Sequence, residues 1–334
     1  TASFLQVFNQ PGARTTDNQF FTNLRYETAL APTLDLLASA GYGRYTYDGQ
    51  YMYGTTNLDH SLGDWWNTEL RLLSRAFSGH KLLVGGEYRR DIHRDQENYD
   101  VSPYLLYLHD NRSKRSQALY VQDEWTLGTS TLVNLGVRHD GSDTDESSTN
   151  PRFALIRKFG AATTGKLLYG SAFRSPNVYE KYYITDAGTY KQNPDLTSEK
   201  IDTLELVLEH YLNQSARVGA SLFGYRIHNL IGLTTDPADG LFVFVNQGDV
   251  ATRGIELRAE RTWTGGTRVR ANYSHQNAED ETTGEWLVNS PRHLAKLNVS
   301  TPVVTGWYTG LELQYVSERL SPFGNTVGGY TVAN

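Results

Sequence analysis

The sequence of 334 residues contains no cysteine, which excludes disulfide bonds, thiolate metal sites and a cysteine nucleophile. It has no run of about 18 apolar residues, so a membrane-spanning helix is excluded as well. The formal net charge is −6, and this balance gives no reason to expect a nucleic-acid partner. A convincing long amphipathic helix is also missing. The fold is therefore expected to consist mainly of β-strands.

Motifs of the common enzyme classes are missing too. The nine histidines include no His-Glu-x-x-His pair, so a zinc enzyme is not expected. Ser290 and His293 are close in sequence, but no Gly-x-Ser-x-Gly elbow accompanies them, and a glycine-rich phosphate-binding loop is absent. A hydrolase carried by a barrel is a minor alternative. We expect neither an enzyme nor a bound cofactor.

Both ends of the sequence resemble internal segments of a longer protein. The N-terminal "TASFLQVFNQ" has no basic region followed by an apolar stretch, so it contains no signal peptide. The C-terminal "GGYTVAN" ends inside an expected strand. We therefore expect an incomplete chain.

A regular alternation of apolar and charged residues is the main structural signal. In "RGIELRAE", which begins at Arg253, Ile255 and Leu257 share one face while Glu256 and Arg258 share the other. A soluble sheet would turn the apolar face to a core and the polar face to water. A membrane barrel would turn the apolar face to lipid and the polar face to a wet or protein-filled lumen. This hairpin alone fits both.

About sixteen segments show this period of two between turn residues. The expected strands are residues 2–9, 20–30, 33–48, 64–77, 80–92, 115–127, 131–142, 151–159, 165–175, 199–212, 215–233, 241–263, 267–278, 290–301, 306–318 and 328–334.

The connections between these strands alternate between short and long. Short links such as "SG" at Ser78, "GTS" at Gly128 and "TGG" at Gly265 are separated by long ones such as "DQENYDVSPYLLYLHDNRSK". Short links then lie together at one end of the sheet and long links at the other. This is the layout of an up-and-down barrel with tight periplasmic turns and long extracellular loops, and a Greek-key sandwich has no reason to keep it. The sequence predicts an all-β fold, a large antiparallel transmembrane β-barrel.

Charges of both signs recur on the polar face, for example Glu69, Arg71, Glu87 and Arg89. Unpaired charges in a dry interior would each cost several kcal/mol, so the lumen must be wide, wet or filled by another polar element. A barrel of about sixteen strands or more encloses such a space. Asp123 departs from the pattern because it falls on the apolar face; a bulge, an interfacial depth or a different register would each explain it.

Several motifs occur together in a fixed order. They are "GSAFRSPNVYEKYY", "NPDLTSEKIDTLELVLEH", "SLFGYRIHNLIGL", "VNQGDVATRGIELRAE" and "NSPRHLAKLNVS". As an ordered set they resemble the C-terminal half of the barrel in TonB-dependent outer-membrane transporters, and "ALYVQDEWTL" resembles the same barrel. The resemblance covers the chain from about Gln117 onward.

This resemblance implies a barrel of about 22 strands with a plug domain in its lumen. Residues 1–334 would be part of that barrel, with neither the plug nor a TonB box. Residues 2–9 would match the fifth strand and 328–334 the third strand from the C-terminus. The missing plug would supply partners for the inward charges.

The implied function is active import across the outer membrane of a Gram-negative bacterium. The expected ligand is a large, scarce nutrient, a ferric siderophore first and cobalamin or haem second. The implied partners are the TonB complex, acting through the plug, and the lipid and lipopolysaccharide of the membrane. A passive porin is the alternative, with the lumen charges lining a diffusion channel.

Tyrosines gather in three of the long connections. Rigid aromatic rings suit a binding mouth, although an aromatic girdle or loop packing would also explain them. Arg174 points inward before the longest loop, where an anionic ligand, a plug carboxylate or a structural ion pair would engage it, the ion pair being favoured. The predicted ligand-binding residues are Tyr51, Tyr53, Tyr99, Arg174, Tyr182 and Tyr183.

Two acidic stretches raise the question of calcium. "HDGSDTDESS" and "DIHRDQENYD" offer oxygen ligands, but neither has the twelve-residue calcium-loop pattern, so solvated loop charges are the favoured interpretation. Gly254 is expected to serve architecture, by permitting a bulge or close packing.

Overall fold

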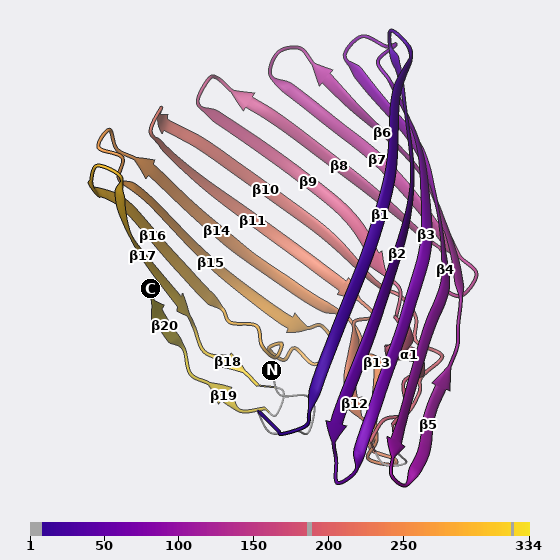
Figure 1. Ribbon diagram of the computed structural model, residues 1–334. Helices are drawn as coiled ribbons and strands as arrows, with labels where there is room; N and C mark the ends of the chain where they lie inside the picture. The colour runs from indigo at the N-terminus through magenta and orange to yellow at the C-terminus, as the bar shows by residue number, and fades with distance from the viewer. Residues whose placement is uncertain (1–8, 186–188, 322–323) are drawn as a thin grey trace.

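The computed structural model describes residues 9–185, 189–321 and 324–334, and it is nearly all β. Its main sheet follows the order β1-β2-β3-β4-β6-β7-β8-β9-β10-β11-β14-β15-β16-β17-β20, so neighbours in this wall are neighbours in sequence (Figure 1). Every pairing is antiparallel, as predicted. The strands are β1 (Arg14–Ala31), β2 (Leu34–Met52), β3 (Thr56–Ser74), β4 (His80–Val101), β6 (Lys114–Leu127), β7 (Thr131–Ser142), β8 (Ser148–Phe159), β9 (Thr163–Arg174), β10 (Glu199–Asn213), β11 (Ala216–His228), β14 (Val250–Thr262), β15 (Arg268–Asp280), β16 (His293–Val304), β17 (Trp307–Val316) and β20 (Tyr330–Ala333).

The two ends of the wall differ, as the alternating connections predicted. Tight turns gather at one end, here called the turn end, and the longer connections gather at the other, the loop end (Figure 1). The loop end carries one short helix and five short strands. They are α1 (Val178–Tyr182), β5 (Tyr104–Asp110), β12 (Ile231–Thr235), β13 (Phe242–Asn246), β18 (Arg319–Leu320) and β19 (Thr326–Val327). Among the described residues, no helix is long and apolar enough to cross a membrane.

Some predicted strand boundaries at the loop end are wrong. The stretch 215–233 is two strands, β11 and β12, because the chain turns at Asn229, whose φ is 55°. The stretch 241–263 is likewise divided into β13 and β14. The link after residue 92 is not a loop, since β4 continues to Val101 and pairs with β5. The predicted strand 2–9 lies almost wholly outside the described residues.

The two faces of the wall carry the predicted residue types. Leucines such as Leu70, Leu119 and Leu204 project from the outer face and are 55%, 72% and 55% exposed. That exposure suits contact with hydrocarbon. On the inner face, charged groups pair across strands: Arg138 forms two hydrogen bonds of 2.7 and 2.8 Å to Glu87. Some of the inward-facing charged side chains are therefore paired with opposite charges within the wall itself.

Asp123 lies near the turn end, five residues before Gly128, where the chain turns. The pairing of β6 with β4 and β7 shows no register shift at this position, so a bulge does not account for it. A carboxylate oxygen of Asp123 lies 2.7 Å from Nδ1 of His80. Position near the rim, with a polar neighbour, thus explains the exception.

Gly254 on β14 permits close packing rather than a bulge. Its pairing with β11 and β15 is regular on both sides. A Cβ atom at this position would overlap the backbone oxygen of His275 and the ring of Phe223. Phe223 is buried and stacks on Tyr225 with ring centroids 4.9 Å apart. The missing side chain makes room for this ring.

We predict that Gly254→Ala lowers the free energy of unfolding by about 1–3 kcal/mol, because the added methyl group must displace packed atoms. Urea unfolding in detergent micelles measures the change. Gly224→Ala is the matched control, since a Cβ atom on Gly224 would meet nothing within 4 Å. Equal stability of the two variants would contradict the packing role.

Candidate functional site

A cavity of about 520 Å³ lies at the loop end, between the inner face of β2, β3 and β4 and the segment that contains α1. Eight of its fifteen lining residues are tyrosines. The others are two aspartates, two asparagines, one serine and two threonines. We call it the aromatic cavity.

Strand alternation places the polar part of this lining. Ser61 and Asn57 on β3 pair with Tyr47 and Tyr51 on β2, and Asp59 pairs with Asn98 on β4. Residues two apart on a strand share a face, so these side chains all point to the lumen. Three neighbouring strands thus contribute one continuous polar and aromatic wall.

Asp59 is held by neutral donors. The Tyr183 hydroxyl donates a hydrogen bond to its carboxylate, and Asn98 lies between them, with its amide nitrogen 3.4 Å from the same hydroxyl. Asn98 is 1% exposed and exchanges two 3.1 Å hydrogen bonds with Asn57. Burial, and then the Asp59 charge, raise the pKa of Tyr183, so its hydroxyl keeps its proton.

Asp100 is held in the same way. It accepts hydrogen bonds from Asn57 at 3.0 Å and from the Tyr107 hydroxyl at 2.7 Å. Neither Asp59 nor Asp100 has a basic partner among the contacts of the described residues. Burial raises the pKa of Asp59, and the hydrogen bonds from Tyr183 and Asn98 act against this shift. Among the described residues, no ion pair with lysine or arginine compensates either carboxylate.

Aromatic rings form the remaining wall. Tyr51 and Tyr53 stack with centroids 5.7 Å apart, and Tyr179 packs against Tyr183 at 4.4 Å and Tyr190 at 6.4 Å. Burial, followed by the neighbouring Tyr51, raises the pKa of Tyr53 to about 12. The phenols are thus neutral at physiological pH, and the cavity offers flat ring faces to a ligand.

Helix α1 is the floor of the cavity, and its two faces have different contacts. Tyr179 and Tyr183 face the cavity, while the Val178 carbonyl accepts a 3.1 Å hydrogen bond from Gln96 of β4. A capping box joins Asn177 and Glu180 at its start. This five-residue helix is therefore fixed by its surroundings rather than by its own length.

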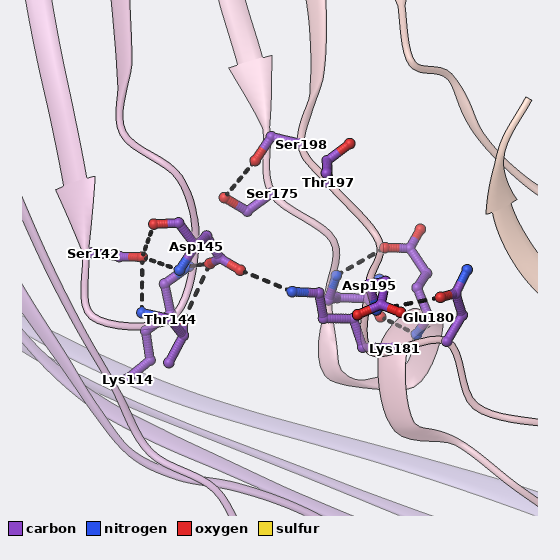
Figure 2. Close-up of polar contacts among 12 residues, drawn as sticks. Lys114, Ser142, Thr144, Asp145, Ser175, Glu180, Lys181, Asp195, Thr197 and Ser198 are labelled. Carbon is purple, nitrogen blue, oxygen red and sulfur yellow. Dashed lines mark hydrogen bonds and ion pairs between the residues drawn. The ribbon is translucent and has the colours of Figure 1, made fainter. Parts of the chain in front are cut away.

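Lys181, on the other side of α1, points to the connection between β7 and β8. Its Nζ lies 3.5 Å from a carboxylate oxygen of Asp145, and Lys114 donates to the other oxygen (Figure 2). Burial raises the pKa of Asp145, but the two ammonium groups outweigh it and the net pKa is lowered. We call this buried group the Asp145 latch.

The structure brings together three of the six predicted ligand residues, Tyr51, Tyr53 and Tyr183. Tyr99 lies on the opposite face of β4, with its ring 5.6 Å from that of Tyr104. Tyr182 faces away from the aromatic cavity, and the Arg112 guanidinium lies 3.3 Å from its ring centroid. These two tyrosines thus lie outside the cavity.

Arg174 also lies outside it. Its guanidinium is 2.9 Å from a Glu180 carboxylate and 2.6 Å from that of Glu199. The favoured structural ion pair is present, with partners from α1 and the start of β10. Arg174 thereby ties the capping box of α1 to the wall.

Sequence reasoning missed Asn57, Asp59 and Asn98. The alternation of Asn57, Asp59 and Ser61 was a usable signal, but the predicted strand 64–77 began too late to include them. Polar residues on both faces of β3 and β4 beyond the apolar part of the wall hide that alternation.

The acidic stretches find partners within the chain. Asp140 lies 2.9 Å from Arg138, and Asp91 lies 2.8 Å from Arg89. Residues 9–185, 189–321 and 324–334 contain no group of three or more histidine, aspartate or glutamate side chains placed to hold a metal ion.

Known proteins of similar sequence are transporters and outer-membrane proteins. The vitamin B12 transporter BtuB of Vibrio cholerae is 27% identical over 63% of this chain, which is 32% of its own length. The iron-regulated outer membrane virulence protein of the same species is 22% identical over 73% of this chain and 40% of its length. The chain thus matches about a third of the length of these curated relatives.

Solved structures support the same fold. The ferric yersiniabactin uptake receptor FyuA from Yersinia pestis superposes with a TM-score of 0.77 at 14% identity, over 97% of this chain and 54% of that one. The family described as "TonB dependent receptor-like, beta-barrel" matches residues 3–334. The ordered strands, the wall and this match agree, and the chain belongs to the β-barrel family of TonB-dependent receptors.

Proposed function

We propose that this barrel serves TonB-dependent import of a large, scarce nutrient across the outer membrane of a Gram-negative bacterium. A ferric siderophore is the first candidate ligand, and cobalamin or haem is the second. The proposed partners are the TonB complex and the lipid and lipopolysaccharide around the barrel. Family membership and the similarity to a vitamin B12 transporter and to an iron-regulated outer membrane protein support this choice.

The observation that carries the proposal is the aromatic cavity. Its volume of about 520 Å³ falls within the range of about 300–1,000 Å³ usual for ligand sites. Its rigid tyrosines offer large contact area at small entropic cost. It also lies at the loop end, where a ligand arriving from outside the cell would meet the receptor.

The Asp145 latch supports a preformed site. Lys181 and Tyr183 belong to the same short segment, so the contact with Asp145 also positions the cavity floor. A site that is ordered before the ligand arrives loses less conformational entropy on binding. A passive porin would gain nothing from such a floor across its lumen.

We predict saturable uptake of labelled ferric siderophore or cobalamin by cells that express this barrel together with the plug that the family resemblance implies, and that lack a receptor of their own. Uptake should disappear when TonB is deleted from the host, because import is driven through that complex. The measurement is cell-associated label against ligand concentration in the two hosts. Uptake that is linear with concentration and independent of TonB would favour the porin instead.

Tyr51→Ala should raise the half-saturating ligand concentration by about tenfold, since a stacked ring is removed from the cavity wall. Tyr99→Ala is the matched control, because Tyr99 is also a tyrosine of the loop end but lies on the outer face of β4. The same uptake assay compares both variants. An unchanged half-saturating ligand concentration in Tyr51→Ala would show that the ligand does not bind in the aromatic cavity.

The ion pairs of the Asp145 latch should stay intact in moderate acid. The folded-state pKa of Asp145 is lowered, so its stabilisation is complete above the ordinary carboxyl pKa and is lost only as pH falls through the lower, folded value. We expect hydrogen-exchange protection of residues 142–148 to be unchanged from about pH 7 to pH 5 and to fall below about pH 4.

Asp145→Asn is the reference for this experiment. It should show reduced protection of residues 142–148 above about pH 5, because the amide cannot form the two ion pairs, and the difference should disappear as Asp145 of the unchanged protein is protonated. Loss of protection in the unchanged protein between pH 7 and pH 5 would show that Asp145 does not hold this loop.

A further inference from the structure

We propose that the aromatic cavity receives an uncharged or positively charged part of the ligand and selects against anionic ligands such as ferric triscatecholates. The inference rests on the proposed import function and narrows its ligand class. Neutral iron chelates of the hydroxamate type and corrinoids fit it.

The lining contains no basic side chain. None of the fifteen described residues around the cavity is lysine, arginine or histidine. The adjoining residues 186–188, between Thr185 and Thr189, read Asp-Ala-Gly in the sequence and add no cation. An anion entering this space would therefore lose hydration without gaining a positive partner.

Two carboxylates make the potential negative. Asp59 is 8% exposed, and Asp100 is half-buried in the same wall. Their partners, Tyr183, Tyr107 and the asparagines, are neutral donors. Charges in a partly dry site interact more strongly than in water, so repulsion of an anion is strengthened here.

Three of the phenol protons are already donated to carboxylates. Tyr45 donates to Asp17, Tyr107 to Asp100 and Tyr183 to Asp59. Such hydroxyls cannot also donate to an anionic ligand without giving up a carboxylate. The faces of the same rings carry the negative side of the aromatic quadrupole, which attracts cations and disfavours anions.

Thr185 offers a polar group to a neutral ligand. Thr185 Oγ1 lines the cavity, is buried and has no hydrogen-bond partner within the described part of the chain. A buried hydroxyl without a partner costs free energy, which a ligand carbonyl or amide would recover. This group favours a ligand with polar, uncharged functions over a fully apolar one.

The basic residues nearest to the aromatic cavity along the lumen line a second cavity. This second cavity of about 520 Å³ shares Tyr45 with the aromatic cavity and is lined by Arg89, Arg94 and Lys114 among others. Arg89 is paired with Asp91 and Lys114 with Asp145, so much of this positive charge is neutralised. A ligand from outside reaches the negative cavity at the loop end first.

The test measures binding to the intact receptor in outer-membrane vesicles. The probes are a neutral ferric trihydroxamate, vitamin B12 and a trianionic ferric triscatecholate, each titrated while bound label is counted. The variant Ser61→Lys adds one cation to the cavity lining. Ser147→Lys is the matched control, because it adds the same charge in the exposed β7–β8 connection outside the cavity.

We expect a neutral probe to bind at least about tenfold more tightly than the triscatecholate, and Ser61→Lys to reduce that preference by about tenfold while Ser147→Lys leaves it unchanged. Equal or tighter binding of the triscatecholate, or equal effects of the two lysines, would overturn the charge selectivity alone. Binding of none of the probes by the folded receptor would overturn the proposed ligand site, and the selectivity with it.

Discussion

Backbone hydrogen bonding between neighbouring strands is the constraint on which the rest of the structure depends. In hydrocarbon no water can satisfy an amide or a carbonyl, so each must pair with the next strand. The wall meets this demand with strands that pair in sequence order (Figure 1). Successive side chains of each strand then point to two different environments. The alternation of leucines with charged residues follows from that division. Gly254 shows how little tolerance remains where rings pack between paired strands.

The same pairing builds the candidate site. Because the register of β2, β3 and β4 is fixed through the wall, their extensions at the loop end bring Tyr51, Asn57 and Asp100 to one surface without further folding information. Only the floor of the cavity depends on contacts other than the strand register. The segment around α1 is too short to be stable alone, and contacts with Gln96, Asp59 and Asp145 hold it in place.

The sequence was sufficient for the fold because the wall is repetitive. Leu70 and Glu69 obey the same rule as Leu204 and Glu205, so many weak signals combine into one architecture. The division of the stretch 215–233 at Asn229 could not be predicted from the sequence, since a single residue with positive φ leaves little trace in a pattern of alternation. The strand β5 was missed because its sequence, YLLYLHD, has apolar residues on both faces and so shows no alternation of apolar with polar residues.

The candidate site could be predicted only in part from the sequence, for a related reason. Tyrosine-rich connections correctly indicated where a cavity would form, and Tyr51, Tyr53 and Tyr183 line it. Which tyrosines turn inward depends on strand parity, and this separates Tyr99 from Asn98 although they are adjacent. Contacts between distant segments, such as Tyr183 with Asp59, depend on how a long connection folds back, which no local pattern encodes.

Helix α1 touches both the aromatic cavity, through Tyr179 and Tyr183, and Asp145, through Lys181. One short rigid body is thus shared by two sites on separate connections. If a molecule bound in the aromatic cavity strengthened the contact between Lys181 and Asp145, thermodynamic reciprocity would require that contact to strengthen its binding by the same factor. The short segment around α1 would then link the β9–β10 connection to the β7–β8 connection.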